Sequence, residues 1–435
     1  MVSGVMTLVL AALVLLATRG SMLLLALAVT AAGYAMVLAI LGTERTGILT
    51  VAIAFGTAPV YKGLASSPDA QVTPTDLLFV VGFALLLPTV INNRLRLPVI
   101  YVVGMGIVLV TGAIGSLLSK EMVGSFLALT LWLMVMGGLP TFMAWWSPAP
   151  RVVELLLWAY VAGHMVSTAV ALKDGPTVQG RYGGLATHFN YFAQAGMLSF
   201  AILLYLFFRY RHRLVRSIAL GAAVVSVYSV HLSGSRAATA VLAVLILMIP
   251  IVERSAVLGF FLALLGALVV IAAPLIVDIA GETSALGRLA GGGGSQYSDQ
   301  ARELGQRDGI SRFWDHPLTG SGLIDLFDIH NNYLEVAVGI GLFGLLGYIL
   351  VLFALARPLF SDDEHRRLAY TVWAYIGFGA TIPSLYDRGI WAPVSLTVLV
   401  ALSWWTTTDR READDGPADV APSTPAMTRE AIPPR

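Results

Sequence analysis

Long apolar runs recur from one end of this 435-residue chain to the other. A helix of about 20 apolar residues spans the hydrocarbon core of a bilayer, so each of these runs is a candidate transmembrane helix. The composition agrees, because 57% of the residues are hydrophobic and only 12% are charged, whereas soluble proteins carry about 25% charged residues. The sequence therefore predicts an all-α, polytopic membrane protein. A membrane barrel would show short segments of alternating polarity instead.

The apolar runs predict a bundle of about 12 to 14 transmembrane helices. The expected ranges are 2–18, 21–42, 47–61, 76–91, 98–119, 123–147, 152–172, 189–208, 214–232, 236–252, 255–277, 331–356, 367–383 and 390–405. Lysine and arginine are enriched in cytoplasmic loops, and three basic clusters near Arg94, Arg209 and Arg366 agree on one orientation with both termini in the cytoplasm. The loops expected on the extracytoplasmic face of the plasma membrane are 62–75, 173–188, 233–236, 278–330 and 384–389.

The chain is expected to form one transmembrane domain over residues 1–405, which includes a large extracytoplasmic loop domain at 278–330. Met1 to Ala17 has neither a charged leading region nor a clear cleavage site, so it is expected to be a retained helix. The tail at 406–435 is polar and rich in proline, which predicts a disordered cytoplasmic segment. Within the large loop, Gly291 to Gly294 is either a flexible run that lets the loop move over a substrate or a spacer.

Composition also limits the function. The net charge of +1 gives no overall field that would attract nucleic acid. The absence of cysteine from the sequence excludes disulfides, thiolate metal sites and a cysteine nucleophile. Asp325, Asp328 and His330 have spacings that suit a divalent metal, but a set from one short loop is unspecific. The first outer loop adds only Asp69 and Asp76, so we expect neither a metal nor another cofactor.

The outer loops are rich in arginine, although positive charge is normally depleted on that face. They contain Arg181, Arg236, Arg302, Arg307, Arg312 and Arg388. A guanidinium group grips a phosphate or diphosphate with two parallel hydrogen bonds. We therefore expect these loops to bind an anionic head group at the membrane surface. The alternative is that each arginine snorkels or pairs with a nearby carboxylate, such as Glu303, Asp308 or Asp387.

Arg236 is the most informative of these arginines, because it follows Ser233-Gly234-Ser235 where a helix is expected to begin. An arginine within a bilayer costs roughly 2.5–3.5 kcal/mol on insertion scales, so it needs a partner or a water-filled cavity. The backbone N–H groups at a helix start attract the same anion. Ser235 directly precedes Arg236 at this helix start, so it is a candidate for a supporting role in anion binding.

His330 is the candidate catalytic base, because an imidazole takes up a proton near neutral pH. Asn331 follows it into the expected helix, and a capping or packing role is the alternative for His330. His188 is a second candidate base. His164 and His231 are expected to be hydrogen-bonded packing residues in or beside apolar runs.

Several short motifs follow one another between residues 181 and 344. They are Arg181-Tyr182-Gly183-Gly184 with Asn190, Ser233-Gly234-Ser235-Arg236, Arg302, His316-Pro317-Leu318 with Gly320 and Gly322, and His330-Asn331 with Leu334, Gly341 and Gly344. In this order, with a long polar loop among them, the chain resembles the O-antigen ligase and O-antigen polymerase family. Members of that family are multi-pass glycosyltransferases that use polyprenyl-diphosphate-linked glycans. One departure is His188-Phe189-Asn190, where many members read Asn-Pro-Asn.

The resemblance implies a metal-independent, inverting transfer of a glycan from a polyprenyl-diphosphate carrier to an acceptor hydroxyl at the outer face of the plasma membrane. The family's arginines correspond to Arg181, Arg236 and Arg302, which would hold the diphosphate. Its loop histidine corresponds to His330, which would orient or deprotonate the acceptor. Candidates for supporting roles are Asn190, Ser235, Arg307, Arg312, Asn331 and Arg388. The expected partners are the lipid-linked donor, a glycan or glycolipid acceptor and membrane lipid, with no nucleic acid.

Four hypotheses for the function follow. A ligase moves a finished glycan to its acceptor, whereas a polymerase extends a lipid-linked glycan with repeat units, and both use the same residues. A transporter of anions or polysaccharide is the third, since arginine-lined pores select anions, but the sequence contains no inverted repeat of the kind common in transporters. A scaffold without catalysis is the fourth.

Overall fold

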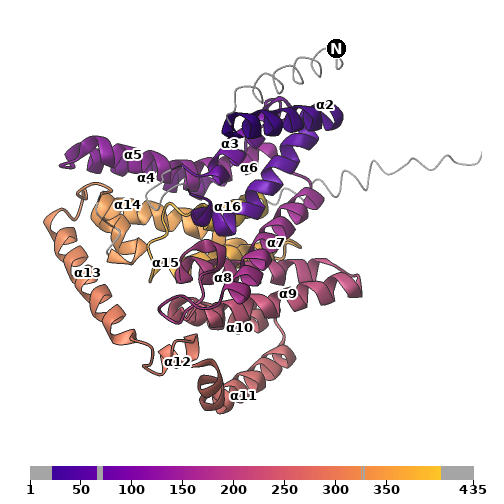
Figure 1. The fold of residues 1–435 in the computed structure, drawn as a ribbon. Helices are drawn as coiled ribbons and strands as arrows, with labels where there is room; N and C mark the ends of the chain where they lie inside the picture. The colour runs from indigo at the N-terminus through magenta and orange to yellow at the C-terminus, as the bar shows by residue number, and fades with distance from the viewer. Residues whose placement is uncertain (1–21, 66–71, 325, 327–328, 403–435) are drawn as a thin grey trace, which may run out of the picture.

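The computed structural model describes residues 22–65, 72–324, 326 and 329–402. The expected first helix at 2–18, the expected disordered tail, and Asp69, Asp325 and Asp328 lie outside the described residues. Regular secondary structure in the described part is helical throughout, with no strand (Figure 1). Eight of the described helices are long and apolar enough to cross a membrane. At this level the all-α, multi-pass membrane fold expected from the sequence is confirmed.

The long spans are α2 (Met22–Thr57) with the 3-10 turn η1 (Ala58–Leu64), α4 (Val99–Leu118), α5 (Met122–Leu133) continuing through η2 (Met134–Gly138) into α6 (Leu139–Trp146), α7 (Pro150–Asp174), α8 (Phe189–Arg209), α9 (Arg213–Leu232), α11 (Ala256–Ala280) and α14 (Asn332–Ala356). The shorter apolar helices are α3 (Pro74–Val90), α10 (Arg236–Val252), and α16 (Arg388–Ser395) with α17 (Thr397–Ala401). The remaining elements are α12 (Ala285–Leu289), α13 (Ser295–Asp315), α15 (Tyr370–Gly379) and the 3-10 turns η3 (Gly184–Ala186), η5 (Arg357–Phe360) and η6 (Arg366–Ala369).

Three elements differ from expectation. The ranges 21–42 and 47–61 form a single element, because Gly42 turns the chain inside α2 at φ 78° and no loop separates the two halves. The span expected at 367–383 is the turn η6 followed by the ten-residue α15. The stretch 278–330 contains two helices, α12 and α13, rather than loop alone. Hydropathy gives no sign of α13, because its residues are mostly polar.

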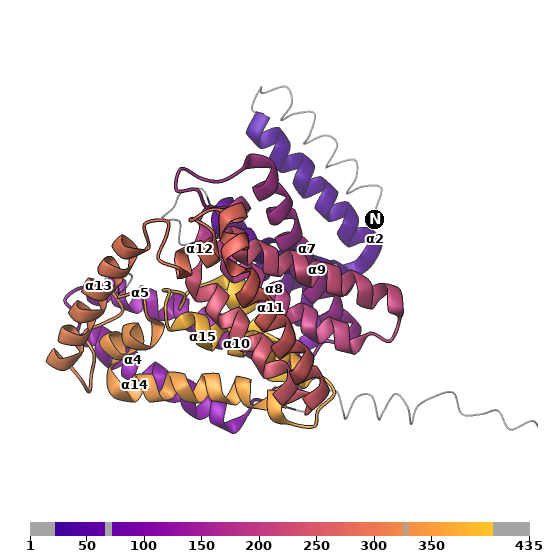
Figure 2. The ribbon, with the colours of Figure 1, turned by 90° about the horizontal axis from the view of Figure 1, so that it is seen from below.

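Helices α4 and α14 lie side by side and antiparallel, with glycines at their contact (Figure 2). A Cβ atom on Gly104 would lie 2.7 Å from the carbonyl oxygen of Gly347. Further along the pair, a Cβ atom on Gly115 would lie 2.7 Å from the carbonyl oxygen of Gly339. Small residues let helix backbones approach closely in a membrane, where packing drives helix association. This contact fixes the position of α14, which begins two residues after His330.

Helix α14 is broken at Gly341, where φ is 75°, and the preceding loop fills the break. The backbone N–H of Leu342 donates to the Pro317 carbonyl oxygen at 2.8 Å, instead of to Val338 four residues earlier. The Val338 carbonyl oxygen accepts from the N–H of Ser321 at 2.8 Å. A bilayer offers no water to unpaired backbone groups, so an irregular helix needs such partners within the protein. The motif around Pro317 therefore docks the polar segment onto α14.

The loops gather in two groups at opposite ends of α8. At its beginning, Arg181 in the loop after α7 donates from Nε to the Ser233 carbonyl oxygen before α10, at 2.7 Å. At its end, Arg209 pairs with Glu154 of α7 at 2.9 Å.

We expect Gly104→Val to destabilise the protein by roughly 1–3 kcal/mol, because a larger side chain overpacks the α4–α14 contact. Gly106→Val is the matched control on the same helix, since a Cβ atom there would meet nothing within 4 Å. Thermal unfolding of both variants in detergent checks this expectation. Equal losses of Tm for the two variants would contradict the packing described here.

Candidate functional site

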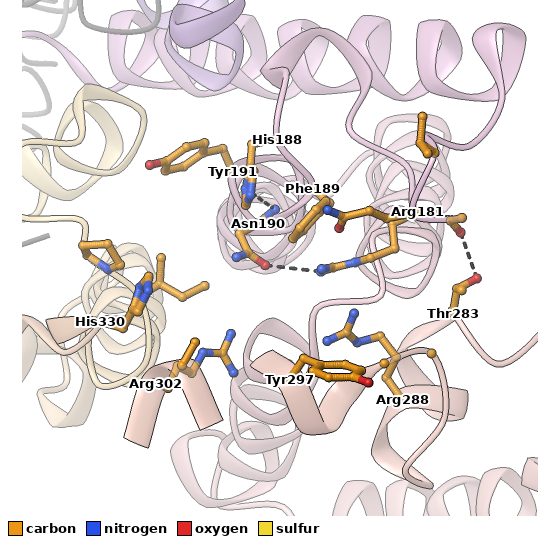
Figure 3. A pocket seen from close by; sticks show the side chains of 18 residues that line it. Arg181, His188, Phe189, Asn190, Tyr191, Thr283, Arg288, Tyr297, Arg302 and His330 are labelled. Atoms are coloured by element: carbon orange, nitrogen blue, oxygen red, sulfur yellow. Dashed lines mark hydrogen bonds between the residues drawn. The ribbon is translucent and has the colours of Figure 1, made fainter. Parts of the chain in front are cut away.

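A cavity of about 980 Å³ opens at the end of the bundle where Arg181 meets Ser233. Its wall comes from four separate parts of the chain, namely residues 178–191, residues 283–302, His330, and Ile382 with Pro383. Figure 3 shows Arg181, Arg288 and Arg302 reaching toward the same space, with His330 at one side of it. No aspartate or glutamate is among the described residues that line this cavity.

Arg181 is buried and held from several sides. Its Nε donates to the Ser233 carbonyl oxygen at 2.7 Å, and one terminal nitrogen donates to Oδ1 of Asn190 at 3.3 Å. The guanidinium also lies over the ring of Phe189, which is a favourable cation–π geometry. Burial first, and then the neighbouring charges of Arg288, Arg302 and Arg236, lower the pKa of Arg181 to about 9. The side chain is therefore a protonated but poorly compensated cation at neutral pH.

The Ser-Gly-Ser turn before α10 is the support behind Arg181. Gly234 has φ +64°, and a Cβ atom there would lie 3.0 Å from Nε of Arg181 and collide with the Thr283 carbonyl oxygen. Thr283 in turn donates from its hydroxyl to the Gly180 carbonyl oxygen at 2.8 Å. Three segments thus meet behind one guanidinium group, and only glycine fits at their junction.

Arg236 and Arg302 share a carboxylate. Both terminal nitrogens of Arg236 donate to Asp299, one of them at 3.0 Å to Oδ2. Arg302, one turn along α13, lies 3.9 Å from the same carboxylate. The hydrogen bond from Arg236 is the main cause that lowers the pKa of Asp299, so this carboxyl is ionised. Arg302 lines the cavity, whereas Arg236 lies behind it with its charge offset by Asp299.

Arg288 also lines the cavity, although it is not among the site residues expected from the sequence. It is 7% exposed, and no described residue accepts a hydrogen bond from its Nε. Burial and the charges of Arg236 and Arg302 lower its pKa. One residue in the sequence could have indicated the helix that carries Arg288, because serine is a common helix N-cap. This residue is Ser284, whose hydroxyl accepts from the N–H of Gly287 at 3.2 Å and caps α12.

His188 caps α8 and faces the cavity. Its Nδ1 accepts from the backbone N–H of Asn190 at 3.2 Å, which places the ring proton on Nε2. Burial, followed by the charges of Arg181, Lys62 and His330, lowers the pKa of His188 to about 4. At neutral pH this ring is thus a neutral hydrogen-bond donor to the cavity rather than a base.

His330 lies at a fixed corner of the backbone. Its φ is 55°, in the left-handed region. Oδ1 of the next residue, Asn331, accepts from the N–H groups of Tyr333 and Leu334 at 3.0 and 3.1 Å and so caps α14. Asn332, buried behind it, is bonded through its amide to Ser384 at 2.8 Å in both directions. Asn331 is therefore part of the support of His330 and is not in the cavity lining.

The other supporting candidates lie outside the cavity lining. Ser235 caps α10, Arg307 pairs with Glu303 at 2.5 Å, Arg312 pairs with Asp308 at 3.8 Å, and Arg388 pairs with Asp76 at 2.8 Å. His164 is buried and bonded to Ser229 at 2.9 Å, as a packing residue. Within the described residues no group of three histidine or acidic side chains is placed to hold a metal ion.

The cavity thus joins four of the expected site residues, Arg181, Asn190, Arg302 and His330, with Arg288 and His188. Guanidinium forks and a neutral imidazole thus face one space, and guanidinium groups of this kind form strong, often bidentate hydrogen bonds with carboxylates and phosphates. In comparisons with known proteins, neither a protein-family model nor a curated protein matches the chain.

We expect Gly234→Ala to weaken the binding of inorganic pyrophosphate about tenfold, because it displaces one charged donor, Arg181. Gly175→Ala is the matched control, since Gly175 also has positive φ but a Cβ atom there would meet nothing within 4 Å. Isothermal titration in detergent measures both. Equal affinities for the two variants would remove the support that we assign to the turn.

Proposed function

We propose that this protein transfers a glycan from a polyprenyl-diphosphate carrier to an acceptor hydroxyl, in the manner of the O-antigen ligase family that its motifs resemble. One observation carries the proposal. Arg181 from the loop before α8, Arg288 from α12 and Arg302 from α13 line one cavity together with His330, and no described lining residue supplies a counter-charge. A diphosphate joined to a lipid tail is a ligand that suits a cationic cavity at the end of an apolar bundle.

The proposed reaction is a single displacement. The acceptor oxygen attacks the anomeric carbon of the glycan, and the bond from that carbon to the diphosphate oxygen breaks. The electron pair of that bond leaves with the diphosphate, which gains one negative charge. Preorganised hydrogen-bond donors accelerate a reaction most when they face the atoms on which charge develops in the transition state. Each such donor contributes a factor of roughly 10²–10³ to the rate. Arg181 and Arg302 are placed for this role.

The proton of the acceptor hydroxyl goes to the imidazole of His330 in this proposal. His330 lines the cavity, and an imidazole accepts a proton near neutral pH. His188 is the less suitable base, because its Nδ1 is already engaged with the backbone. The neutral Nε2–H of His188 instead donates to a substrate oxygen.

The substrate enters from the membrane in this scheme. The eight long apolar helices support a multi-pass membrane protein, and the prenyl tail would remain among lipid-facing surfaces while the head group enters the cavity. We assign the reaction to the extracytoplasmic face of the plasma membrane on the positive-inside pattern of the sequence. The acceptor is a glycan or glycolipid, and repeat-unit polymerisation would use the same donor chemistry with a lipid-linked acceptor.

Arg302→Ala is expected to lower the rate of glycan transfer about 10²–10³-fold, through loss of one charged donor to the leaving diphosphate. Arg307→Ala is the matched control, since Arg307 is on the same helix, exposed and paired with Glu303. Transfer from a lipid-linked glycan in proteoliposomes gives the rates. Normal transfer by Arg302→Ala would remove the assignment of this arginine to the substrate.

His330→Asn is expected to retain donor binding and to lower turnover by about 10²–10⁴-fold, the usual contribution of a positioned base. Asparagine tolerates left-handed backbone, so the corner at position 330 should persist. Donor affinity and turnover are measured separately. If affinity falls as much as turnover does, His330 is a ligand of the donor and not the base.

A further inference from the structure

Arg288 differs from the other arginines around the cavity, because the described part of the protein gives it no partner. Arg181 donates to Ser233 and Asn190, and Arg236 is paired with Asp299. Arg302 also lies within ion-pair distance of Asp299. The described residues offer Arg288 neither a hydrogen bond nor an ion pair, although it is only 7% exposed. Asp299 attracts the charge of Arg288 only from beyond ion-pair distance. A buried cation that is compensated only in part lowers the stability of a folded protein.

The local backbone holds Arg288 in this position. Ser284 caps the single turn of α12 that carries Arg288. Gly293, with φ +60°, closes over its side chain, since a Cβ atom there would lie 3.2 Å from Cγ of Arg288. Figure 3 shows the guanidinium group of Arg288 directed into the cavity, toward Arg181. The glycine run at 291–294 is therefore a defined turn that shapes this wall.

We propose that Arg288 is a direct ligand of a phosphoryl anion in the cavity, and that this anion provides the hydrogen-bond and ion-pair partner that the described residues do not. The inference rests on the proposed function only for the source of the anion, which would be the diphosphate of the lipid-linked donor. Its chemistry holds equally for inorganic pyrophosphate. Arg288 then joins Arg181 and Arg302 as the third fork around one diphosphate.

This role and a purely structural role predict opposite effects of neutralising Arg288. If Arg288 is a ligand, Arg288→Met removes a poorly compensated charge, so the variant without ligand keeps or raises the Tm of the wild type. The same variant binds the anion more weakly than the wild type does. If Arg288 only supports the fold, the same change lowers Tm without ligand and leaves the affinity of the folded protein unchanged.

The experiment follows thermal unfolding of the full chain in detergent with increasing inorganic pyrophosphate and, in a second arm, farnesyl diphosphate. We expect both anions to raise the Tm of the wild type and Arg288→Met to weaken this effect at least about tenfold, a charged hydrogen bond being worth roughly that factor. Arg288→Lys, which keeps the charge but not the fork, should bind with intermediate affinity. Arg307→Met is the matched control and should respond as the wild type does.

If farnesyl diphosphate alone stabilises the wild type, and Arg288→Met weakens that effect at least about tenfold, Arg288 is a ligand and the anion comes from a lipid-linked source. The proposal is overturned if Arg288→Met keeps the wild-type response, if it fails to fold or loses Tm without ligand, or if neither anion stabilises the wild type. Failure of the glycosyltransferase proposal looks different. In that case the anions bind through Arg288, but no lipid-linked glycan is transferred.

Discussion

Like charges held close together repel one another, and this repulsion is the constraint around which the cavity is built. Burial and then the charges of Arg288, Arg302 and Arg236 lower the pKa of Arg181, and the carboxylate of Asp299 offsets part of the charge beside them. The fold holds the cluster together by anchoring individual side chains, most clearly Arg181 on the Ser233 carbonyl oxygen. An arrangement that is strained by its own charge is well suited to a ligand with more than one negative charge.

The bundle provides the rigidity that this arrangement needs. The glycine contact between α4 and α14 and the loop that fills the break at Gly341 together fix the first turn of α14. Asn331 then caps α14, and Asn332 is bonded to Ser384, so the backbone that follows His330 is fixed. A group that must be placed accurately is thus carried at the start of a capped and anchored helix.

Much of the fold could be predicted from the sequence, because hydropathy is a local property. The span expected at 98–119, for example, is Val99–Leu118. The polar helix α13 and the break at Gly341 could not, since neither leaves a periodic apolar pattern. For the cavity, the motifs gave Arg181, Arg302 and His330. They could not give the pairing of Arg236 with Asp299 across 63 residues, or the burial of Arg288, because both depend on how distant segments pack.

The central claim is that the guanidinium groups of the cavity bind a lipid-linked diphosphate beside His330. Its most direct test is a cryo-EM structure of the protein in nanodiscs with polyprenyl diphosphate. The account predicts density for both phosphates within hydrogen-bond distance of Arg181, Arg288 and Arg302, and a prenyl tail that leads toward the membrane. Diphosphate density elsewhere on the protein, or none in the cavity at saturating ligand, would contradict it.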